Sequence, residues 1–258
     1  MKKLNCTLAL SVLLAGTLCA ADDPFCGKWK LNKDKSKIAG EQVKIEDLGN
    51  DTYKFTFGDL SDTVKADGTD QPIHFGRTRS ITKEGSNSWK IVTKKDGKVV
   101  DWVTETLSDD GNTILLKGTN NKPDGTASDY EVKVKRVGSG SGWAGTWEST
   151  DVQLSSPDEF EIKPYGAHGL TFYTPAWQDT LSLNFDGQDY PEKGPRVAPG
   201  STSSGKRIDE HTLEITSKVK DKVVEHDRWE ASQDGKMLTL AIHETGQPNT
   251  LTVVFDKM

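Results

Sequence analysis

Apolar and polar residues alternate with a period of two over most of the chain. Tyr53, Phe55 and Phe57, for example, alternate with Lys54 and Thr56. A two-residue period predicts β-strands that bury one face and expose the other, and we expect no long amphipathic helix. The same pattern continues around later apolar residues in both halves of the chain, among them Ile91, Val103, Leu116, Val132, Ile162, Phe172, Leu183, Ile215, Leu240 and Val253.

Asp-Gly pairs separate many of these runs. They occur at residues 96–97, 110–111, 124–125, 186–187 and 234–235. Aspartate and glycine tolerate the positive φ angles of tight hairpin turns, so the pairs favour antiparallel pairing of consecutive strands. We therefore predict an all-β fold with about eight to ten short strands in each half, closed into an antiparallel β-barrel. Two β-sandwiches are the alternative.

The second half of the sequence repeats the first. Gly27 and Trp29 recur 118 residues later as Gly145 and Trp147, and residues 98–100 recur 124 residues later. A repeat of this length indicates a duplicated domain rather than a solenoid of short units.

A Gly-Ser-Gly-Ser-Gly segment at residues 138–142 separates the two copies. This is the composition of a flexible linker. We therefore predict a first barrel at residues 21–137, a linker at 138–142 and a second barrel at 143–258.

Residues 1–20 carry the features of an export signal. Lys2 and Lys3 precede a short apolar run at residues 8–18, and small residues follow. This pattern is typical of a cleavable signal peptide, and the run is too short to span a membrane. We expect a secreted or periplasmic protein without a transmembrane segment. Because Cys19 does not directly follow the Leu-Ala-Gly order of lipoprotein signals, we do not expect lipidation.

The chain is acidic overall. Its formal net charge is −6, and cleavage after residue 20 would make it more negative by removing two lysines. An acidic surface argues against a nucleic-acid partner, and we expect a monomer. Cys26 would then be the one remaining cysteine, which excludes an internal disulfide. Beside Phe25 and Trp29 it suits a buried apolar position, and an intermolecular thiol is the alternative.

Three segments carry a resemblance to a known family. Residues 24–32 read Pro-Phe-Cys-Gly-Lys-Trp-Lys-Leu-Asn, residues 95–100 read Lys-Asp-Gly-Lys-Val-Val, and residues 232–239 read Ser-Gln-Asp-Gly-Lys-Met-Leu-Thr. The combination resembles an uncharacterised family of secreted bacterial proteins with lipocalin-like, calycin-type β-barrel domains. The resemblance implies such a barrel in each copy, but no activity that could be transferred to this chain.

The resemblance also implies a role for the repeated Gly-x-Trp motif. In lipocalins the tryptophan of this motif closes one end of the barrel. Trp29 and Trp147, with Gly27 and Gly145, are therefore expected to be structural plugs rather than ligand contacts. The second copy departs from the family pattern directly after the motif, where residues 148–150 read Glu-Ser-Thr.

No motif for catalysis or cofactor binding is present. The sequence has no nucleophile elbow, phosphate-binding loop, dinucleotide fingerprint or His-Glu-x-x-His motif. His226 and His243 fall on neighbouring expected strands, but a metal site needs three or four converging ligands. We predict no catalytic residues, no metal and no cofactor. A hydrolase or isomerase built inside a barrel ranks third among the functional hypotheses.

The most informative strand for ligand binding follows the Lys-Val-Val turn, because it differs between the copies. There Arg228 is a candidate for holding a carboxylate head group, with Trp229 or Phe185 packing against an apolar tail. The alternative, and commoner, role for such residues is that of solvent-facing positions that pair across a sheet. The full set of candidate ligand contacts is Arg228, His226, Glu230, Trp229 and Phe185 in the second copy, and Arg79, Arg77 and Trp102 in the first.

Two functional hypotheses from different classes lead. The first is an exported, non-enzymatic binding protein that holds a small apolar or amphipathic molecule in, or at the mouth of, a lipocalin-like barrel. The alternative is an envelope or extracellular interaction or scaffold protein, with filled barrels and no small ligand. The first rests on analogy between folds, which is weak support for a function.

Overall fold

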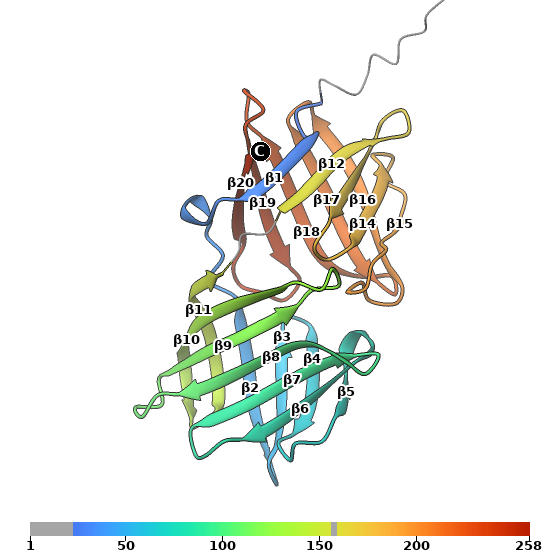
Figure 1. Ribbon diagram of the computed structural model, residues 1–258. Helices are drawn as coiled ribbons and strands as arrows, with labels where there is room; N and C mark the ends of the chain where they lie inside the picture. Colours follow the sequence, from blue (N-terminus) through green and yellow to red (C-terminus); the bar gives the residue numbers. More distant parts are fainter. Residues whose placement is uncertain (1–22, 156–158) are drawn as a thin grey trace, which may run out of the picture.

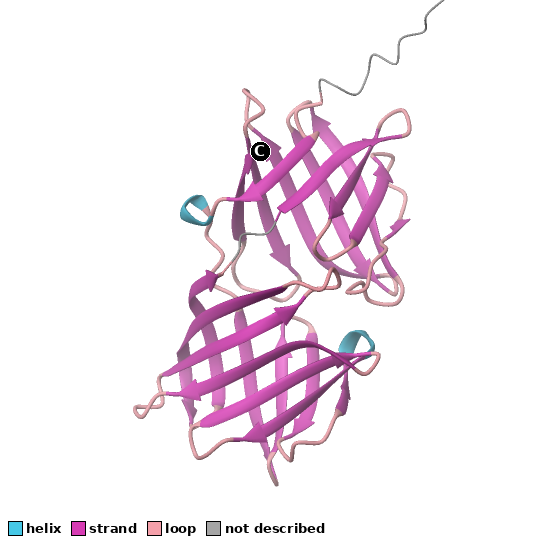
Figure 2. Cartoon of the chain, in the orientation of Figure 1, coloured by secondary structure: helices cyan, strands magenta, loops and turns pink. Residues whose placement is uncertain are grey.

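The computed structural model describes residues 23–155 and 159–258 and consists almost entirely of antiparallel strands (Figures 1 and 2). Two ten-stranded sheets each curl into a nearly closed barrel, which confirms the predicted all-β fold of two tandem barrels. In the described residues, the helices are two three-residue 3₁₀ turns, η1 (Lys33–Lys35) and η2 (His74–Gly76). No helix in those ranges combines the length and apolar character needed to cross a membrane. The predicted signal peptide, with Cys19, lies outside the described residues.

The first barrel has the strand order β4-β3-β2-β11-β10-β9-β8-β7-β6-β5. Its strands are β2 (Gln42–Gly49), β3 (Thr52–Phe57), β4 (Leu60–Lys65), β5 (Gln71–Ile73), β6 (Arg77–Lys83), β7 (Ser88–Lys95), β8 (Lys98–Leu107), β9 (Thr113–Asn121), β10 (Ala127–Ser141) and β11 (Ala144–Leu154). The Gln71 side chain helps to close it: its amide accepts from Lys65 N (2.8 Å) and donates to Lys65 O (2.7 Å), as a paired peptide group would.

The second barrel has the order β14-β13-β12-β1-β20-β19-β18-β17-β16-β15. Its strands are β1 (Gly27–Leu31), β12 (Glu159–Tyr165), β13 (Gly169–Thr174), β14 (Asp179–Asn184), β15 (Tyr190–Pro191), β16 (Ser201–Asp209), β17 (Thr212–Val219), β18 (Lys222–Ala231), β19 (Met237–Glu244) and β20 (Leu251–Lys257). A bridge between Thr180 and Lys193 brings its two edges together.

The division of the chain between the barrels differs from the predicted one. β1, the first strand of copy one, pairs with β12 and β20 in the second barrel (Figure 1). β11, the first strand of copy two, pairs with β2 and β10 in the first barrel. The exchanged strands occupy equivalent places, because Gly27 lies opposite Ile162 and Gly145 opposite Ile45. The first barrel is thus one continuous segment inserted between β1 and β12 of the second.

Residues 138–142, predicted as a linker, form the end of β10 and its turn into β11. Arg136 holds this hairpin, since its guanidinium donates to Gly142 O (2.5 Å) and Ala144 O (2.6 Å), and it also donates to Gly111 O in the turn between β8 and β9. A Cβ atom on Gly140 or Gly145 would lie 2.5 or 2.3 Å from Arg136 Nη1. These glycines therefore make room for the arginine, which is a packing role rather than a source of flexibility.

The duplication appears directly in the strand registers. Three cross-strand neighbours of the first barrel recur 124 positions later in the second: Arg79, Thr93 and Asp101 correspond to Ser203, Ser217 and Glu225. The backbone positions are conserved between the barrels while the side chains differ, so the two interiors can be compared residue by residue.

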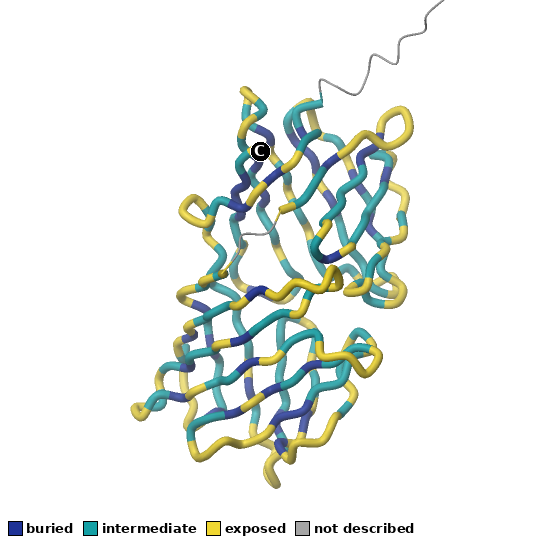
Figure 3. The backbone as a smooth tube through the Cα atoms, viewed as in Figure 1, coloured by how far each residue is buried: buried dark blue, intermediate teal, exposed yellow. Residues whose placement is uncertain are grey.

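Each barrel has its own hydrophobic core (Figure 3). Trp29 in the second barrel and Trp147 in the first are fully buried. Each indole Nε1 donates to a carbonyl four residues earlier, Phe25 O at 2.9 Å and Trp143 O at 3.0 Å. Because of the strand exchange, each tryptophan packs in the core of the other copy's barrel.

Cys26 is a free, partly buried thiol that packs against the second core. Burial raises its pKa to about 11, with a smaller contribution from Asp23. The thiol is therefore protonated at neutral pH, when its reactivity as a nucleophile is low.

Candidate ligand site

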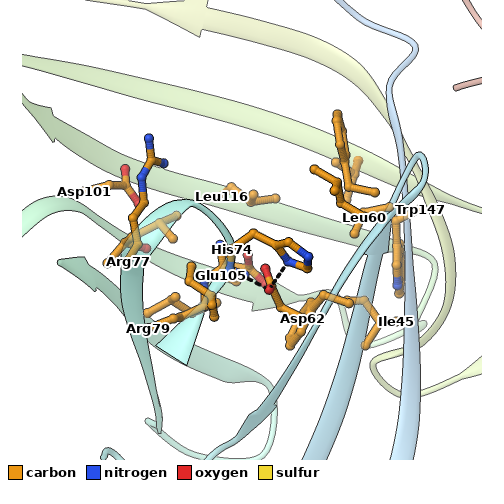
Figure 4. Close-up of a pocket in the computed structure, with 18 of the residues that line it drawn as sticks. Ile45, Leu60, Asp62, His74, Arg77, Arg79, Asp101, Glu105, Leu116 and Trp147 are labelled. Atoms are coloured by element: carbon orange, nitrogen blue, oxygen red, sulfur yellow. Dashed lines mark hydrogen bonds and ion pairs between the residues drawn. The ribbon is translucent and has the colours of Figure 1, made fainter. Parts of the chain in front are cut away.

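The first barrel encloses a cavity of about 400 Å³. Its walls are mostly apolar, and Ile45, Phe55, Leu116 and the plug Trp147 are among the residues that line it (Figure 4). Binding sites for small molecules are typically apolar hollows with a few placed polar groups. The polar groups of this cavity come from β4, β6, β8, β10 and η2.

Two strands carry charged residues on their inward faces. On β6, Arg77 and Arg79 share a face with buried positions further along the strand. On β8, Asp101 and Glu105 flank the buried Val103 at alternate positions. Because side chains alternate between the two faces of a strand, the apolar neighbours fix the direction of the charged ones. All four therefore project into the barrel.

Arg77 and Arg79 form the basic side of the cavity. The Nε atoms of both are buried and have no hydrogen-bond partner in the described part of the chain. Arg77 lies beside Asp101 (Figure 4), and its Nη2 donates to Arg196 O of the second barrel at 3.4 Å. Burial lowers the pKa of Arg77, and repulsion from Arg196 and Arg79 lowers it further. The pair thus presents hydrogen-bond donors that the protein does not fully satisfy.

Asp101, Glu105 and Tyr130 form the acidic side of the cavity. Tyr130 Oη donates to Asp101 Oδ1 at 2.9 Å. Burial raises the pKa of Asp101, although this hydrogen bond and Arg79 act in the opposite direction. Burial raises the pKa of Glu105 to about 7 despite the attraction of Arg79. Burial and the adjacent Asp101 raise the pKa of Tyr130. Glu105 therefore changes charge near neutral pH, whereas Tyr130 stays protonated.

A third polar pair lies where η2 meets β4. His74 Nδ1 and Asp62 Oδ1 are 2.5 Å apart, and His74 N donates to the same oxygen at 2.9 Å (Figure 4). The next residue, Phe75, has a φ of 64°, which is unusual for a bulky side chain. Phe75 lines both this cavity and a second hollow between the two barrels. The turn therefore forms part of the rim of the first barrel.

Four of the predicted ligand contacts point inward. Arg77 and Arg79 line the cavity of the first barrel, and Trp229 lines a separate cavity in the second. Phe185 packs against the second core, with the Arg207 guanidinium 5.0 Å from its ring centroid. The structure therefore brings together Arg77 and Arg79, but it places Trp229 and Phe185 in the other barrel.

The other four predicted contacts lie on outer faces. Trp102 and His226 are exposed. The Arg228 side chain is 46% exposed and bonds Glu214 (3.1 Å) and Glu230 (2.8 Å). The proposed role of Arg228 in holding a head group beside Trp229 is not compatible with this geometry, because consecutive strand residues face opposite sides. These residues pair across the outer surface, the alternative considered from the sequence.

His226 lies directly opposite His243, as the strand assignment predicted. His226 Nδ1 is 3.2 Å from Thr216 Oγ1, and His243 Nδ1 is 3.4 Å from Thr250 Oγ1. In the described ranges no three His, Cys, Asp or Glu side chains gather closely enough to hold a metal ion.

Asp101, Glu105 and Tyr130 were not predicted as ligand contacts from the sequence. A usable signal was present in β8, because Asp101 and Glu105 alternate with Val103 and Leu107, and both valine and leucine are buried. Tyr130 had no such signal. It lies opposite Gly118 on β9, where the absence of a side chain leaves room for the phenol ring: a Cβ on Gly118 would lie 2.5 Å from the Tyr130 Oη.

Comparison with protein-family models, with curated proteins and with solved structures finds no match to this chain. Function is therefore inferred from the geometry and chemistry of the two barrels.

Proposed function

We propose that this protein is an exported, non-enzymatic binding protein that holds a small amphipathic molecule in the first barrel. The apolar part of the molecule packs against the wall formed by residues such as Phe55 and Leu116. An anionic head group, such as a carboxylate, binds Arg77 and Arg79. The observation that carries the proposal is a pair of inward guanidinium groups, with unpaired Nε atoms, in a largely apolar cavity of about 400 Å³.

The charges of the empty cavity support an anionic head group. Burying a guanidinium is costly unless its donors are satisfied. Asp101 already accepts a hydrogen bond from Tyr130, and Glu105 has a pKa of about 7. The two carboxyl groups therefore compensate the two arginines incompletely at neutral pH. A carboxylate can take two parallel hydrogen bonds from one guanidinium, which gives both affinity and orientation.

The cavity also supports a binding protein over the scaffold alternative. That alternative assumed barrels filled by side chains, whereas the first barrel leaves a space large enough for a small molecule. Side chains that served only to fill the barrel would be expected to be apolar, because buried polar groups without partners lower stability.

Binding of paired probes tests the proposal. The mature chain is titrated with decanoate and with phenylbutyrate, and with decanol as the uncharged counterpart, followed by isothermal calorimetry and native mass spectrometry. We expect both carboxylates to bind in a one-to-one complex, and Arg79→Gln to weaken their binding by roughly tenfold or more, as for loss of a charged hydrogen bond. Decanol should bind the parent and the variant with similar, weaker affinity.

Arg228→Ala is the matched control, because it removes an arginine from the outer face of the second barrel. It should leave decanoate binding unchanged. Absence of binding of both carboxylates to the folded parent, or equal loss of affinity in Arg228→Ala and Arg79→Gln, contradicts the proposal.

A further inference from the structure

The second barrel holds a cavity of about 420 Å³ with an aromatic wall. Phe160 and Phe172 both contact Trp229, with ring centroids 5.8 and 5.3 Å apart, and Phe160 meets Phe255 edge to face at 4.7 Å. Four aromatic rings on one side of a hollow form a surface that attracts cations through their electron-rich faces.

Carboxyl groups face the same hollow. Glu225 and Asp227 project from β18, and Glu192 follows β15. Glu192 Oε1 accepts from Ser203 Oγ at 2.5 Å. One cation also lines the cavity, Arg196, but its guanidinium is bonded to Asp179 at 2.7 Å. The hollow therefore has more acidic than basic groups.

The register of the duplicated strands shows how the two interiors differ. The position of Arg79 in the first barrel is occupied by Ser203 in the second. The equivalent inward positions of β8 and β18 also carry different residues. Three inward positions of the first barrel carry a chemically different residue 124 positions later in the second. Arg79 is replaced by Ser203, Val103 by Asp227, and Glu105 by Trp229. The second barrel lacks the two arginines of β6, carries its second β18 carboxyl group at Asp227 in place of Val103, and has an indole in place of Glu105.

Three polar atoms of the residues that line this cavity lack partners. Asp179 Oδ1, Asp227 Oδ1 and Trp229 Nε1 are buried and make no hydrogen bond within the described residues. Burial, followed by the proximity of Glu225, raises the pKa of Asp227 to about 9. The environment of the Asp227 carboxyl therefore favours its protonated form, and a bound cation can take the place of that proton.

We propose that the second barrel is a separate site for an organic ammonium cation, primary or quaternary, held between the aromatic wall and the carboxyl groups of Asp227 and Glu225. The proposal does not depend on the function proposed for the first barrel. An ammonium group bearing carbon substituents fits this lining better than a metal ion. Aromatic rings attract such a cation, whereas a metal ion needs several converging oxygen or nitrogen ligands.

The cavity borders the hollow between the barrels. Glu192, Ser217 and Glu225 line both the cavity and that hollow. Phe57 and Leu60 line both the hollow and the cavity of the first barrel. The two cavities therefore adjoin the same hollow.

The test compares a cation with its uncharged isostere on the full mature chain. Benzyltrimethylammonium, choline and 3,3-dimethylbutan-1-ol, which replaces the choline nitrogen by carbon, are titrated by calorimetry, with Trp fluorescence as a second readout. We expect the cations to bind at least roughly tenfold more tightly than the alcohol. Asp227→Asn should reduce cation affinity by roughly tenfold or more, while its affinity for the alcohol stays unchanged.

Two further variants keep the test specific to this cavity. Trp229→Leu should also weaken cation binding, whereas Glu214→Gln, which removes an outward-facing carboxylate of the same sheet, should not. Arg79→Gln in the first barrel should leave cation binding unchanged, which separates this site from the carboxylate site. Failure of both cations to bind the folded protein at about 10 mM, or equal binding of choline and its isostere, overturns the proposal.

Discussion

Buried charges in the first barrel follow the same alternation that places its apolar residues. Arg79 and Glu105 point inward because their strands bury every second position, and the Nε atom of Arg79 has no hydrogen-bond partner in the described residues. Removing ionisable groups from water costs free energy unless they are paired. A purely structural barrel would gain stability from apolar residues at these positions, so their retention is most simply explained by a ligand.

The free-energy cost of burying Glu105 depends on pH and can be measured. Its pKa is about 7 in the folded protein, against an ordinary value of 4.5, because burial outweighs the attraction of Arg79 and Asp101 adds repulsion. The folded state binds the proton more tightly than the unfolded state, so stability falls as the pH rises from about 4.5 and the loss is complete above about 7. The difference between these two pKa values corresponds to at most about 3 kcal/mol in the free energy of unfolding.

We therefore expect Glu105→Gln to be more stable than the parent at pH 8 by up to about 3 kcal/mol, and nearly equal to it at pH 4. Urea unfolding at the two pH values measures the free energy of unfolding of both proteins. Because other titrating groups contribute equally to variant and parent, their contributions cancel in the difference. Glu131→Gln is the control, since Glu131 is an exposed partner of Lys117. A Glu105→Gln stability difference that does not change with pH contradicts the assignment.

The same group links stability to binding. An anionic head group on Arg79 approaches Glu105 and favours its protonated form, since like charges repel. The titratable and charged groups that face Glu105 are Arg79, Asp101 and Tyr130. We expect decanoate affinity to fall as the pH rises through about 7 in the parent, and this slope to be lost in Glu105→Gln. Calorimetry between pH 6 and 8, about one pH unit either side of the transition, measures the pH dependence of the affinity. The same pH dependence in both proteins would count against a head group near Glu105.

The candidate site could be predicted in part from these alternations. Arg77 and Arg79 were among the predicted ligand contacts and line the cavity of the first barrel, whereas Arg228, the preferred contact, lies on the outer face of the second. β18 misled because both of its faces are charged: Glu225 and Asp227 point inward, and Arg228 points outward. A period of two identifies the faces of a strand, but with ionisable residues on both it does not reveal which face is buried.

At the scale of elements, the strands and Asp-Gly turns were predicted well, while the Gly/Ser segment was not. Its composition is that of a linker, but Gly140 and Gly145 are required by the close approach of Arg136 to the backbone. The equivalent contact in the second barrel places Lys257 against Gly27. A long-range packing requirement and a flexible linker thus produce the same local composition.

This interpretation predicts the effect of a single methyl group. In Gly145→Ala the new Cβ would lie 2.3 Å from Arg136 Nη1, and the residue has a φ of 150°, which side chains other than glycine rarely adopt. We expect a loss of at least about 2 kcal/mol in the free energy of unfolding. Ser141→Ala, in the same hairpin, should stay within about 0.5 kcal/mol of the parent. Urea unfolding measures the free energy of unfolding of both variants. A Gly145→Ala variant as stable as the parent would show that the hairpin tolerates rearrangement.

The exchange of β1 and β11 could not have been read from the sequence. Both strands carry the Gly-x-Trp motif, and both fit the same register, with Gly27 opposite Ile162 and Gly145 opposite Ile45. Each barrel therefore offers an equivalent place to either strand. What distinguishes the two arrangements lies in the connections, where a tight hairpin joins β10 to β11 and leaves β1 to the second barrel.

At the scale of the whole molecule, the two barrels are held together by more than the exchanged strands. Gln247 is buried, and its amide exchanges two hydrogen bonds with the backbone of Gln42, at 2.8 and 2.9 Å. Asn249 donates to Gly40 O at 2.7 Å, and Lys222 pairs with Asp59 at 3.2 Å. The barrels thus share a polar interface next to the hollow that both cavities border.

The insertion of one barrel into the other predicts which fragment folds alone. Residues 40–155 contain all ten strands of the first barrel, its plug Trp147 and the Arg136 hairpin. Residues 24–137, which begin three residues inside the predicted first barrel at 21–137, lack β11 and leave β2 and β10 with unpaired edges and the core without that tryptophan. Exposed edges and a missing core residue of this size cost several kcal/mol, comparable to the whole stability of a domain.

We therefore expect fragment 40–155 to show a β-rich circular dichroism spectrum and a cooperative thermal transition, at a lower temperature than the full chain because it loses the contacts to Gln247 and Asn249. Fragment 24–137 should be unfolded or aggregated. Cooperative unfolding of 24–137, or its absence in 40–155, would mean that the strand exchange does not define the folding unit.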